Sequence, residues 1–175
     1  MKLRKIAIVG PESTGKSLLS QQLAEHFHTV WVEEYARDFL HELGREYQQA
    51  DLIDIAKGQL ALEAQQAIAA NSFLFCDTNL LVIKVWSKFV FGEIDPWLVE
   101  NMKLDTYNLH LLTDVDLPWE EDPLREHPHR RKELFDIYHH ELLSAGVPFE
   151  IVSGEGPDRL ASALKALEVH SLISA

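Results

Sequence analysis

The chain has 175 residues, of which 46% are hydrophobic, and it contains one cysteine, Cys76. This suits one globular domain with its own core, and a single cysteine excludes an intramolecular disulfide, which fits a reducing cytoplasm. The formal net charge of −12 argues against a broad nucleic-acid-binding surface. No apolar run approaches the roughly 20 residues of a membrane-spanning helix. We therefore expect a cytoplasmic domain with neither nucleic acid nor a membrane as its partner, and the oligomeric state stays open.

The first feature along the chain is a strand, a loop and a helix in succession. Residues 5–9 are apolar and rich in β-branched side chains, which predicts a buried parallel strand. Residues 18–27 carry apolar side chains at helical spacing. Between them, residues 10–17 read Gly-Pro-Glu-Ser-Thr-Gly-Lys-Ser and match the phosphate-binding pattern G-x-x-x-x-G-K-[ST] at every fixed position. Because the motif stands in the context that it requires, an ordinary glycine-rich turn is much the weaker alternative.

This loop predicts a site for the phosphates of a nucleotide and for the Mg²⁺ that they carry. Gly10 and Gly15 let the backbone turn tightly and approach phosphate oxygens. Lys16 can reach the β- and γ-phosphates, and the hydroxyl of Ser17 can bind Mg²⁺. The loop amides and the positive end of the following helix complete an anion-binding nest. The other nucleotide contacts that we expect from this segment are Glu12, Ser13, Thr14 and Leu18.

Apolar runs and helical patterns alternate along the rest of the chain. In order, we predict a strand at 29–32, a partly helical stretch at 33–43, a long helix at 48–70, a strand at 73–76, a helix at 80–91, a strand at 109–113, a polar, proline-interrupted segment at 114–130, a helix at 132–145, a strand at 148–152 and a helix at 157–170. This alternation predicts a three-layer α/β fold with a five-stranded, mostly parallel sheet and helices on both faces. In such sheets ligands bind beyond the carboxyl ends of the strands, so the residues that follow each strand form one candidate site. Gly154, which follows the last strand, and Arg125, in the polar segment, are our remaining candidates for nucleotide contacts.

Asp77 directly follows the third predicted strand, where phosphate-loop proteins place a carboxylate that holds Mg²⁺. The alternative is that Asp77 caps the next helix, since aspartate is favoured at helix N-termini. The two roles are compatible and the metal role is favoured. We therefore predict Ser17 and Asp77 as the metal ligands.

Charged residues after the second predicted strand would face the side of the loop where a molecule that accepts a phosphoryl group could bind, which we call the acceptor side. Glu34 could take a proton from an attacking hydroxyl or hold a ribose. Arg37 could bind a phosphate or orient Glu34, and Asp38 stands beside it. A solvated helix face with an ion pair between Glu34 and Arg37 is an equally good interpretation of the spacing.

Aromatic residues near the same segment are candidates for stacking on an aromatic ligand. Trp31, Tyr35 and Phe39 lie on the acceptor side by sequence position. Trp86 and Phe89 have the helical spacing that is typical of core residues, so we expect them in the core.

The polar segment before the predicted helix at 132–145 carries Arg125, Arg130 and Arg131. Arginines on a mobile loop can neutralise developing charge and exclude water, which favours a lid. An ordinary polar surface loop is the alternative. His127 and His129 stand in the same segment, but no third ligand follows at zinc-site spacing, so we expect no zinc.

Taken together, the motifs resemble the nicotinamide riboside kinase domain of NadR-type proteins, a family of AAA-like phosphate-loop ATPases. The matching segments are 10–17, Glu-Tyr-Ala-Arg-Asp at 34–38, Lys-Gly-Gln at 57–59, Cys-Asp-Thr-Asn at 76–79, Pro-Trp at 118–119 and Leu-Arg at 124–125. The resemblance implies one nucleoside-kinase-like domain over residues 1–175 with a short lid at about 114–131. It also implies ATP-dependent phosphorylation of a ribosyl hydroxyl, which gives nicotinamide mononucleotide in NAD biosynthesis. Matched by position, the catalytic residues are Lys16, Glu34, Asp77 and Arg125, and the acceptor-binding residues are Glu34, Tyr35, Arg37, Asp38 and Asn79.

Two positions near the expected acceptor depart from the family pattern. Asn79 stands where the family often has aspartate, and Glu33 stands where the well-known members have an aromatic residue. The chain also shows no H-x-G-H adenylyltransferase signature, so we expect the kinase domain alone. The alternatives are a kinase for a different nucleoside or metabolite, and a phosphate-loop ATPase or nucleotide-binding regulatory module. A GTPase switch is disfavoured because the sequence has neither D-x-x-G nor N/T-K-x-D.

Overall fold

The central strand of the fold is β1 (Arg4–Val9), whose residues Ile6 to Val9 are fully buried. In this computed structural model, which describes residues 2–174, five strands form one sheet in the order β2-β3-β1-β4-β5. The other strands are β2 (Trp31–Val32), β3 (Phe73–Asp77), β4 (Leu109–Thr113) and β5 (Phe149–Val152). All four pairings within this sheet are parallel, so the predicted α/β fold is confirmed.

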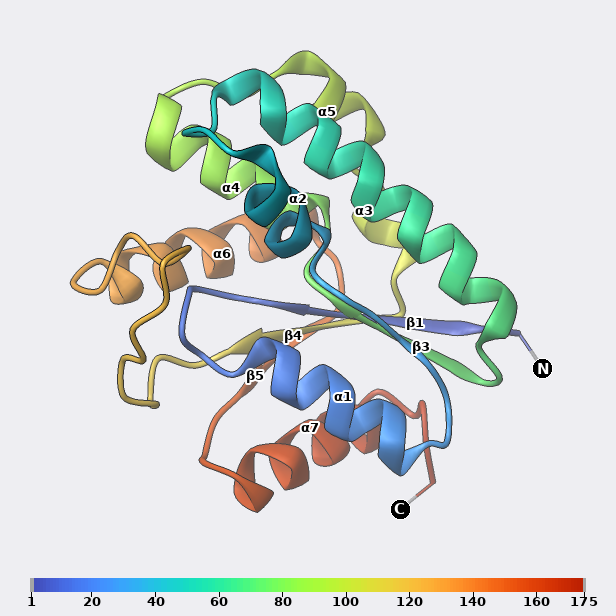
Figure 1. Ribbon diagram of the computed structural model, residues 1–175. Coiled ribbons are helices and arrows are strands. Elements are labelled where there is room, and N and C mark those ends of the chain that lie inside the picture. Colours follow the sequence, from blue (N-terminus) through green and yellow to red (C-terminus); the bar gives the residue numbers. More distant parts are fainter. Residues whose placement is uncertain (1, 175) are drawn as a thin grey trace.

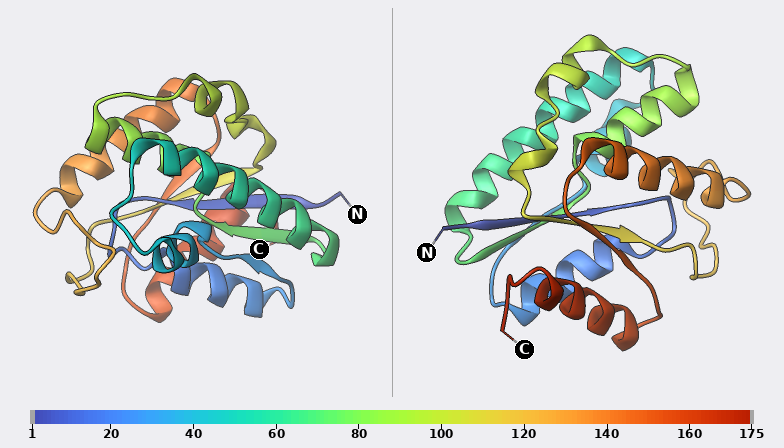
Figure 2. Two further views of the ribbon diagram at one scale, coloured as in Figure 1. Left: turned by 45° about the horizontal axis from the view of Figure 1, so that its top comes forward. Right: turned by 180° about the vertical axis from the view of Figure 1, so that it is seen from behind.

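Helices cover both faces of the sheet (Figure 1). Below it in that view lie α1 (Lys16–His26) and α7 (Pro157–Val169), which form one apolar core with the sheet. Above it lie α3 (Gln49–Ala69), α4 (Leu80–Phe91) and α6 (Arg131–Ala145), and a second core lies between α4, α6 and the sheet. Two views from other directions show the same three layers (Figure 2).

A third apolar cluster lies away from the sheet. It joins α3 and α4 to α2 (Tyr35–Leu43) and α5 (Pro96–Asn101). Neither α5 nor a short 3₁₀ turn at Leu104–Thr106 is among the elements predicted from the sequence. Signals for α5 were present, since Asp95 caps it by accepting from the Trp97 N–H at 2.8 Å and Pro96 occupies its first turn.

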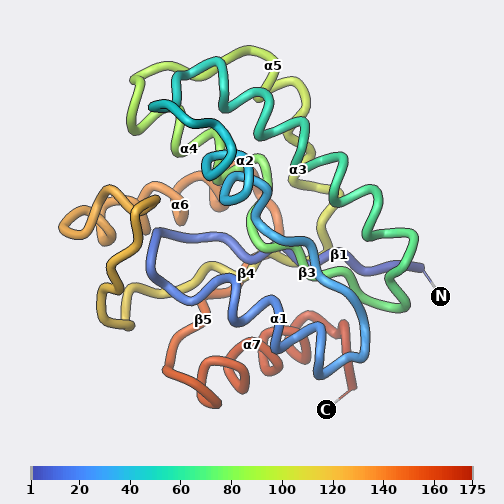
Figure 3. Tube along the Cα trace, viewed as in Figure 1, coloured from blue at the N-terminus to red at the C-terminus, as the bar shows by residue number. Residues whose placement is uncertain are grey.

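Some helix and strand boundaries differ slightly from the predicted ones, and these differences affect residues of the candidate site. The first helix begins at Lys16, so Lys16 and Ser17 belong to its first turn. The third strand extends to Asp77, which is therefore a strand residue. The polar segment from 114 to 130 stays without helix or strand and runs back toward the loop after β1, as the Cα trace shows (Figure 3).

None of the helices described between residues 2 and 174 has both the length and the apolar character needed to cross a bilayer.

Candidate active site

The phosphate-binding loop runs from the end of β1 to the start of α1 and is pressed against the end of β4. Gly10 has a φ of 142°, and a Cβ there would overlap with Oγ1 of Thr113. Only glycine suits this backbone and this close approach. Thr14 is fully buried, and its Oγ1 lies 2.7 Å from Thr113 Oγ1 and donates to the Pro11 carbonyl at 2.8 Å. The Thr14 side chain therefore supports the loop, which leaves its backbone amide as the group for a nucleotide contact.

Lys16 and Ser17 begin α1 just after Gly15, which takes a left-handed conformation with φ 76°. The Lys16 ammonium donates to the Pro11 carbonyl at 2.7 Å, so its charge lies inside the loop. Ser17 is exposed, and Leu18 is 58% exposed. The N-terminus of α1 and the Lys16 charge together favour an anion at this point.

Asp77 is 1% exposed, and neither of its carboxylate oxygens has a hydrogen-bond partner within the described residues. Burial raises its pKa to about 7, the Glu34 carboxylate adds to the rise, and the Lys16 and Ser17 groups oppose it. A buried carboxylate without a partner is costly unless a cation satisfies it. Asp77 and Ser17 therefore fit a Mg²⁺ that is otherwise held by phosphate oxygens, since protein magnesium sites often use only one or two carboxylates.

Asn79, and not Asp77, caps the following helix. Its Oδ1 accepts a hydrogen bond from the Leu81 N–H at 3.0 Å, while its Nδ2 is buried without a partner in the described part of the chain. The helix cap that was weighed as an alternative role for Asp77 is therefore supplied two residues later. Asn79 is buried and does not line the cavity described below.

The Lys-Gly-Gln segment of α3 holds the backbone on both sides of Glu34. Gln59 is 1% exposed, accepts from the Tyr35 N–H at 2.9 Å and donates to the Glu33 carbonyl at 3.2 Å. The Tyr35 ring lies directly on Gly58, where a Cβ would overlap with it. Tyr35 thus packs in the third apolar cluster, outside the cavity, and its fixed position sets where Glu34 stands.

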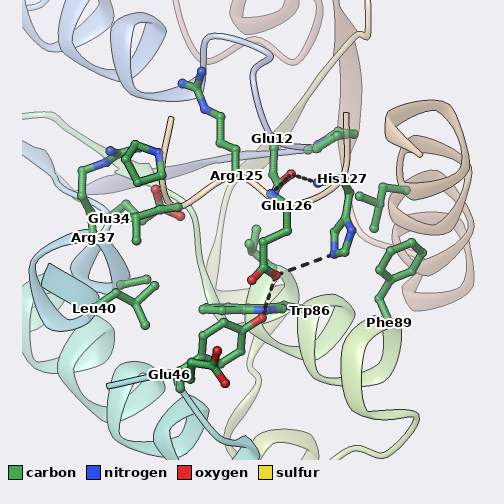
Figure 4. A pocket seen from close by; sticks show the side chains of 18 of the residues that line it. Glu12, Glu34, Arg37, Leu40, Glu46, Trp86, Phe89, Arg125, Glu126 and His127 are labelled. Carbon is green, nitrogen blue, oxygen red and sulfur yellow. Dashed lines mark hydrogen bonds and ion pairs between the residues drawn. The ribbon is translucent and has the colours of Figure 1, made fainter. Parts of the chain in front are cut away.

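A cavity of about 240 Å³ lies beside the loop, with Glu34 and Arg37 in its wall. Gly10, Pro11 and Glu12 line one side, and residues of α2, α4 and α6 line the rest together with segments 45–47 and 123–127. Figure 4 shows Glu34, Arg37, Trp86 and Phe89 around this space. A cavity that combines apolar walls with a few charged groups suits a small polar ligand with an aromatic part.

The aromatic residues of the cavity are not those that the sequence favoured. Tyr47, Trp86 and Phe89 line it, although Trp86 and Phe89 also pack against the apolar cores as expected. The Trp86 indole N–H donates to the Tyr47 hydroxyl at 3.1 Å, which fixes one edge of the ring. Trp31 packs against the core on the α1 face, while Tyr35 and Phe39 pack in the third cluster.

The segment from 114 to 131, which we call the lid segment, is bound to the loop. The Glu12 carboxylate accepts from the backbone N–H groups of Glu126 at 3.2 Å and His127 at 3.0 Å. The Ser13 hydroxyl accepts from the Glu120 N–H at 2.9 Å, and Arg131 donates to the Ser13 carbonyl at 3.0 Å. Each of these hydrogen bonds joins a side chain of one segment to a main-chain group of the other.

Two arginines of the predicted site form contacts that involve the lid segment. Arg37 pairs with Asp122 at 2.9 Å, which raises the pKa of Arg37 and, together with the Leu124 N–H, lowers that of Asp122. Arg125 donates to the Glu120 carbonyl at 2.6 Å and reaches Ser13 Oγ at 3.5 Å. Asp38 is exposed in the first turn of α2 and does not line the cavity.

On the other side of the loop, Gly154 belongs to a network of hydrogen bonds and an ion pair that follows β5. Its N–H donates to Asp116 Oδ2 at 2.6 Å, and its carbonyl accepts from Arg159 Nε at 2.8 Å. Arg159 is 4% exposed, forms an ion pair with Asp116 and lies beside Gly15. Arg159 is not predictable as a site residue from the sequence, because it stands inside a helical pattern and no motif marks it.

Residues 5–159 match the AAA domain family, so the chain belongs to that family. The trifunctional NAD biosynthesis/regulator protein NadR of Escherichia coli (strain K12) is 32% identical over 127 residues, which cover 70% of this chain and 31% of the relative. Among solved structures, a NadR protein in complex with NR is similar with a TM-score of 0.80 and 22% identity, over 98% of this chain and 52% of that one. Thymidylate kinase from Ehrlichia chaffeensis is similar with a TM-score of 0.67 and 13% identity, over 97% of this chain and 99% of that one.

Fold and loop together define a phosphate-loop domain with the fold of nucleoside and nucleotide kinases. Within this class, the predicted resemblance to NadR-type proteins is confirmed. The chain spans 31% of the length of the curated NadR proteins that it matches, so it corresponds to one part of them.

Proposed function

We propose that this chain is an ATP- and Mg²⁺-dependent kinase that phosphorylates nicotinamide riboside to nicotinamide mononucleotide in NAD biosynthesis. The observation that carries the proposal is that the phosphate-binding loop forms one wall of the cavity through Gly10, Pro11 and Glu12. A phosphoryl donor in the loop and an acceptor in the cavity would therefore be neighbours. The similarity to NadR proteins, one of them solved with NR, supports this acceptor.

On the donor side, the loop would hold the phosphates of ATP through its amides, Lys16 and the N-terminus of α1. The loop residues Glu12, Ser13, Thr14 and Gly15, together with Leu18 and Gly154, remain our proposed nucleotide contacts. Ser17 and Asp77 would hold Mg²⁺, which would neutralise part of the negative charge of the phosphates. Lys16 and Arg125 would stabilise the negative charge of the transferring phosphoryl group.

On the acceptor side, Glu34 would orient or deprotonate the ribosyl 5′-hydroxyl, with Arg37 beside it. The flat face of Trp86 would carry the aromatic ring of the nucleoside. The two positions that depart from the family pattern leave the cavity wall unchanged, because Asn79 caps α4 and Glu33 is exposed, and neither lines the cavity.

The domain and lid assignments belong to the same proposal. Residues 1–175 would act as one cytoplasmic kinase domain, and the lid segment would exclude water from the reacting phosphate. Its hydrogen bonds to Glu12 and Ser13 support that role.

The test is an assay with Mg-ATP and a panel of nucleosides in which ADP and the phosphorylated product are both measured. We expect nicotinamide riboside to be phosphorylated faster than the other nucleosides, and Glu34→Gln to lower turnover more than ATP affinity. Turnover of nicotinamide riboside no faster than ATP hydrolysis in buffer would refute the acceptor. Turnover of another nucleoside would favour a kinase for that compound, and ATP hydrolysis without transfer would favour an ATPase or a regulatory module.

A further inference from the structure

The cations of the cavity are already neutralised by protein groups. Each of the three arginines that line it is paired with a carboxylate outside the lining: Arg37 with Asp122 at 2.9 Å, Arg45 with Asp51 at 2.7 Å and Arg125 with Glu120 at 3.7 Å. These arginines therefore contribute little net positive charge toward a ligand.

The carboxylates of the cavity are not neutralised in the same way. Glu34, Glu46 and Glu126 line it, and none forms an ion pair with a lysine or arginine among residues 2–174. A fourth lining carboxylate, Glu12, is bound by two neutral backbone amides. The wall of the cavity thus carries an excess of negative charge, which favours a cationic ligand.

Glu126 is the carboxylate best placed to act on an aromatic ligand. Its Oε2 accepts from the Tyr47 hydroxyl at 2.7 Å, and the same hydroxyl accepts from the Trp86 indole N–H at 3.1 Å. Figure 4 shows Glu126 extending from the lid segment toward Trp86. Aromatic faces and a carboxylate around one space recognise a flat cation, since both the ring quadrupole and the negative charge attract it.

We propose that Glu126 is a specificity-determining residue that selects a nucleoside with a positively charged base over a neutral nucleoside of the same shape. This inference rests on the proposed function, because nicotinamide riboside contains a pyridinium ring and so belongs to that class. A neutral ring in the same place would desolvate the carboxylate without compensating its charge, which is how a site rejects a near-isostere.

The experiment compares nicotinamide riboside with benzamide riboside, in which a neutral benzene ring replaces the pyridinium ring. Glu126→Gln removes the charge and keeps an oxygen that can accept from Tyr47. Because the Glu126 side chain is 43% exposed and solvent screens its charge, we expect the kcat/KM ratio of the charged to the neutral nucleoside to fall by about fivefold. The control is Glu121→Gln, the same charge change on an exposed lid-segment residue outside the cavity, for which we expect an unchanged ratio.

Two results would overturn the inference. One is that Glu126→Gln lowers kcat/KM equally for both nucleosides, which would mean that the residue only holds the lid segment. The other is that Glu121→Gln changes the ratio as much as Glu126→Gln does, which would mean that overall charge is responsible.

A binding measurement separates this inference from the proposed function. If neither nucleoside is phosphorylated, the proposed function fails, and tryptophan fluorescence can still compare 1-methylnicotinamide, a cation, with neutral nicotinamide. We expect the cation to bind at least about threefold more tightly to the unmodified chain, and Glu126→Gln to remove this preference. A chain that does not bind the cation more tightly than the neutral ring would refute the role of Glu126.

Discussion

Replacing Gly58 by alanine tests how the acceptor side of the site is positioned. Gly58 lies inside α3, where alanine normally stabilises a helix by about 1 kcal/mol relative to glycine. Here the new Cβ would overlap with Cδ1, Cε1 and Cζ of Tyr35, and overpacking of this kind costs about 1–3 kcal/mol. Because all three overlaps are severe, the cost lies toward the upper end of that range, and we expect a net loss of about 1–2 kcal/mol in the free energy of unfolding, or roughly 2–8 °C in Tm.

The overlap also displaces the start of α2, where Glu34 stands next to Tyr35. We expect turnover of the nucleoside to fall by about tenfold with little change in ATP binding, since a small misplacement at a reacting centre is costly. Thermal unfolding measures the stability change, and the coupled assay for ADP measures the turnover.

Making Gly58→Ala in a Tyr35→Ala variant as well tests the packing argument directly. With Tyr35→Ala the ring is absent, and Gly58→Ala should then stabilise the chain by up to about 1 kcal/mol through helix propensity. The sign of the same substitution thus reverses between the two backgrounds. A Gly58→Ala variant that raises Tm while Tyr35 is present, or that has the same effect in both backgrounds, would refute the packing argument.

Three further predictions follow from other residues of the fold. Lys16→Ala should lower phosphoryl transfer by about 100-fold or more, because a charge aimed at the transferring phosphate is lost, while Tm stays within about 2 °C; full activity in the transfer assay would mean that the loop is not the phosphate site. Gln59→Leu should lower the free energy of unfolding by about 1–3 kcal/mol in denaturant, because the Tyr35 N–H and the Glu33 carbonyl lose their partner. The same variant should lower kcat more than it raises the KM for ATP. Loss of stability with unchanged kcat would show that Gln59 does not position Glu34. His110 is fully buried, and burial lowers its pKa to about 4 from a usual 6.5. The unfolded chain therefore binds the extra proton, and about 3 kcal/mol of the stability present above pH 6.5 is lost as the pH falls toward 4. His110→Leu should flatten this part of the pH–stability curve and exposed His129→Leu should not, and equal curves for the unmodified chain and His110→Leu would contradict the prediction.

The architecture could be predicted from the sequence because its signals are local. Each strand is an apolar run, each helix has its own spacing, and the loop at 10–17 combines both with a motif. Asp77 could be placed for the same reason, since it stands directly at the end of a buried run.

The cavity could not be predicted in this way, because it depends on how helices pack. Trp86 and Phe89 have the spacing of core residues, and Trp86 does pack against the third cluster, but α4 also turns part of the same face toward the cavity. Tyr35 carries no local sign that its ring will pack on a glycine 23 positions later in the chain. Lys-Gly-Gln could be noticed as a motif, but its purpose is visible only once Gly58 and Gln59 lie against Glu33 and Tyr35.

The attachment of the lid segment to Glu12 has a consequence for which substitutions this chain can tolerate. Glu12 binds the backbone amides of residues 126 and 127, which every residue except proline supplies. The side chains at these two positions are therefore free to vary without loss of the attachment. Since the same two residues line the cavity, substitutions there can change the chemistry of the cavity wall while the lid segment stays attached to the loop.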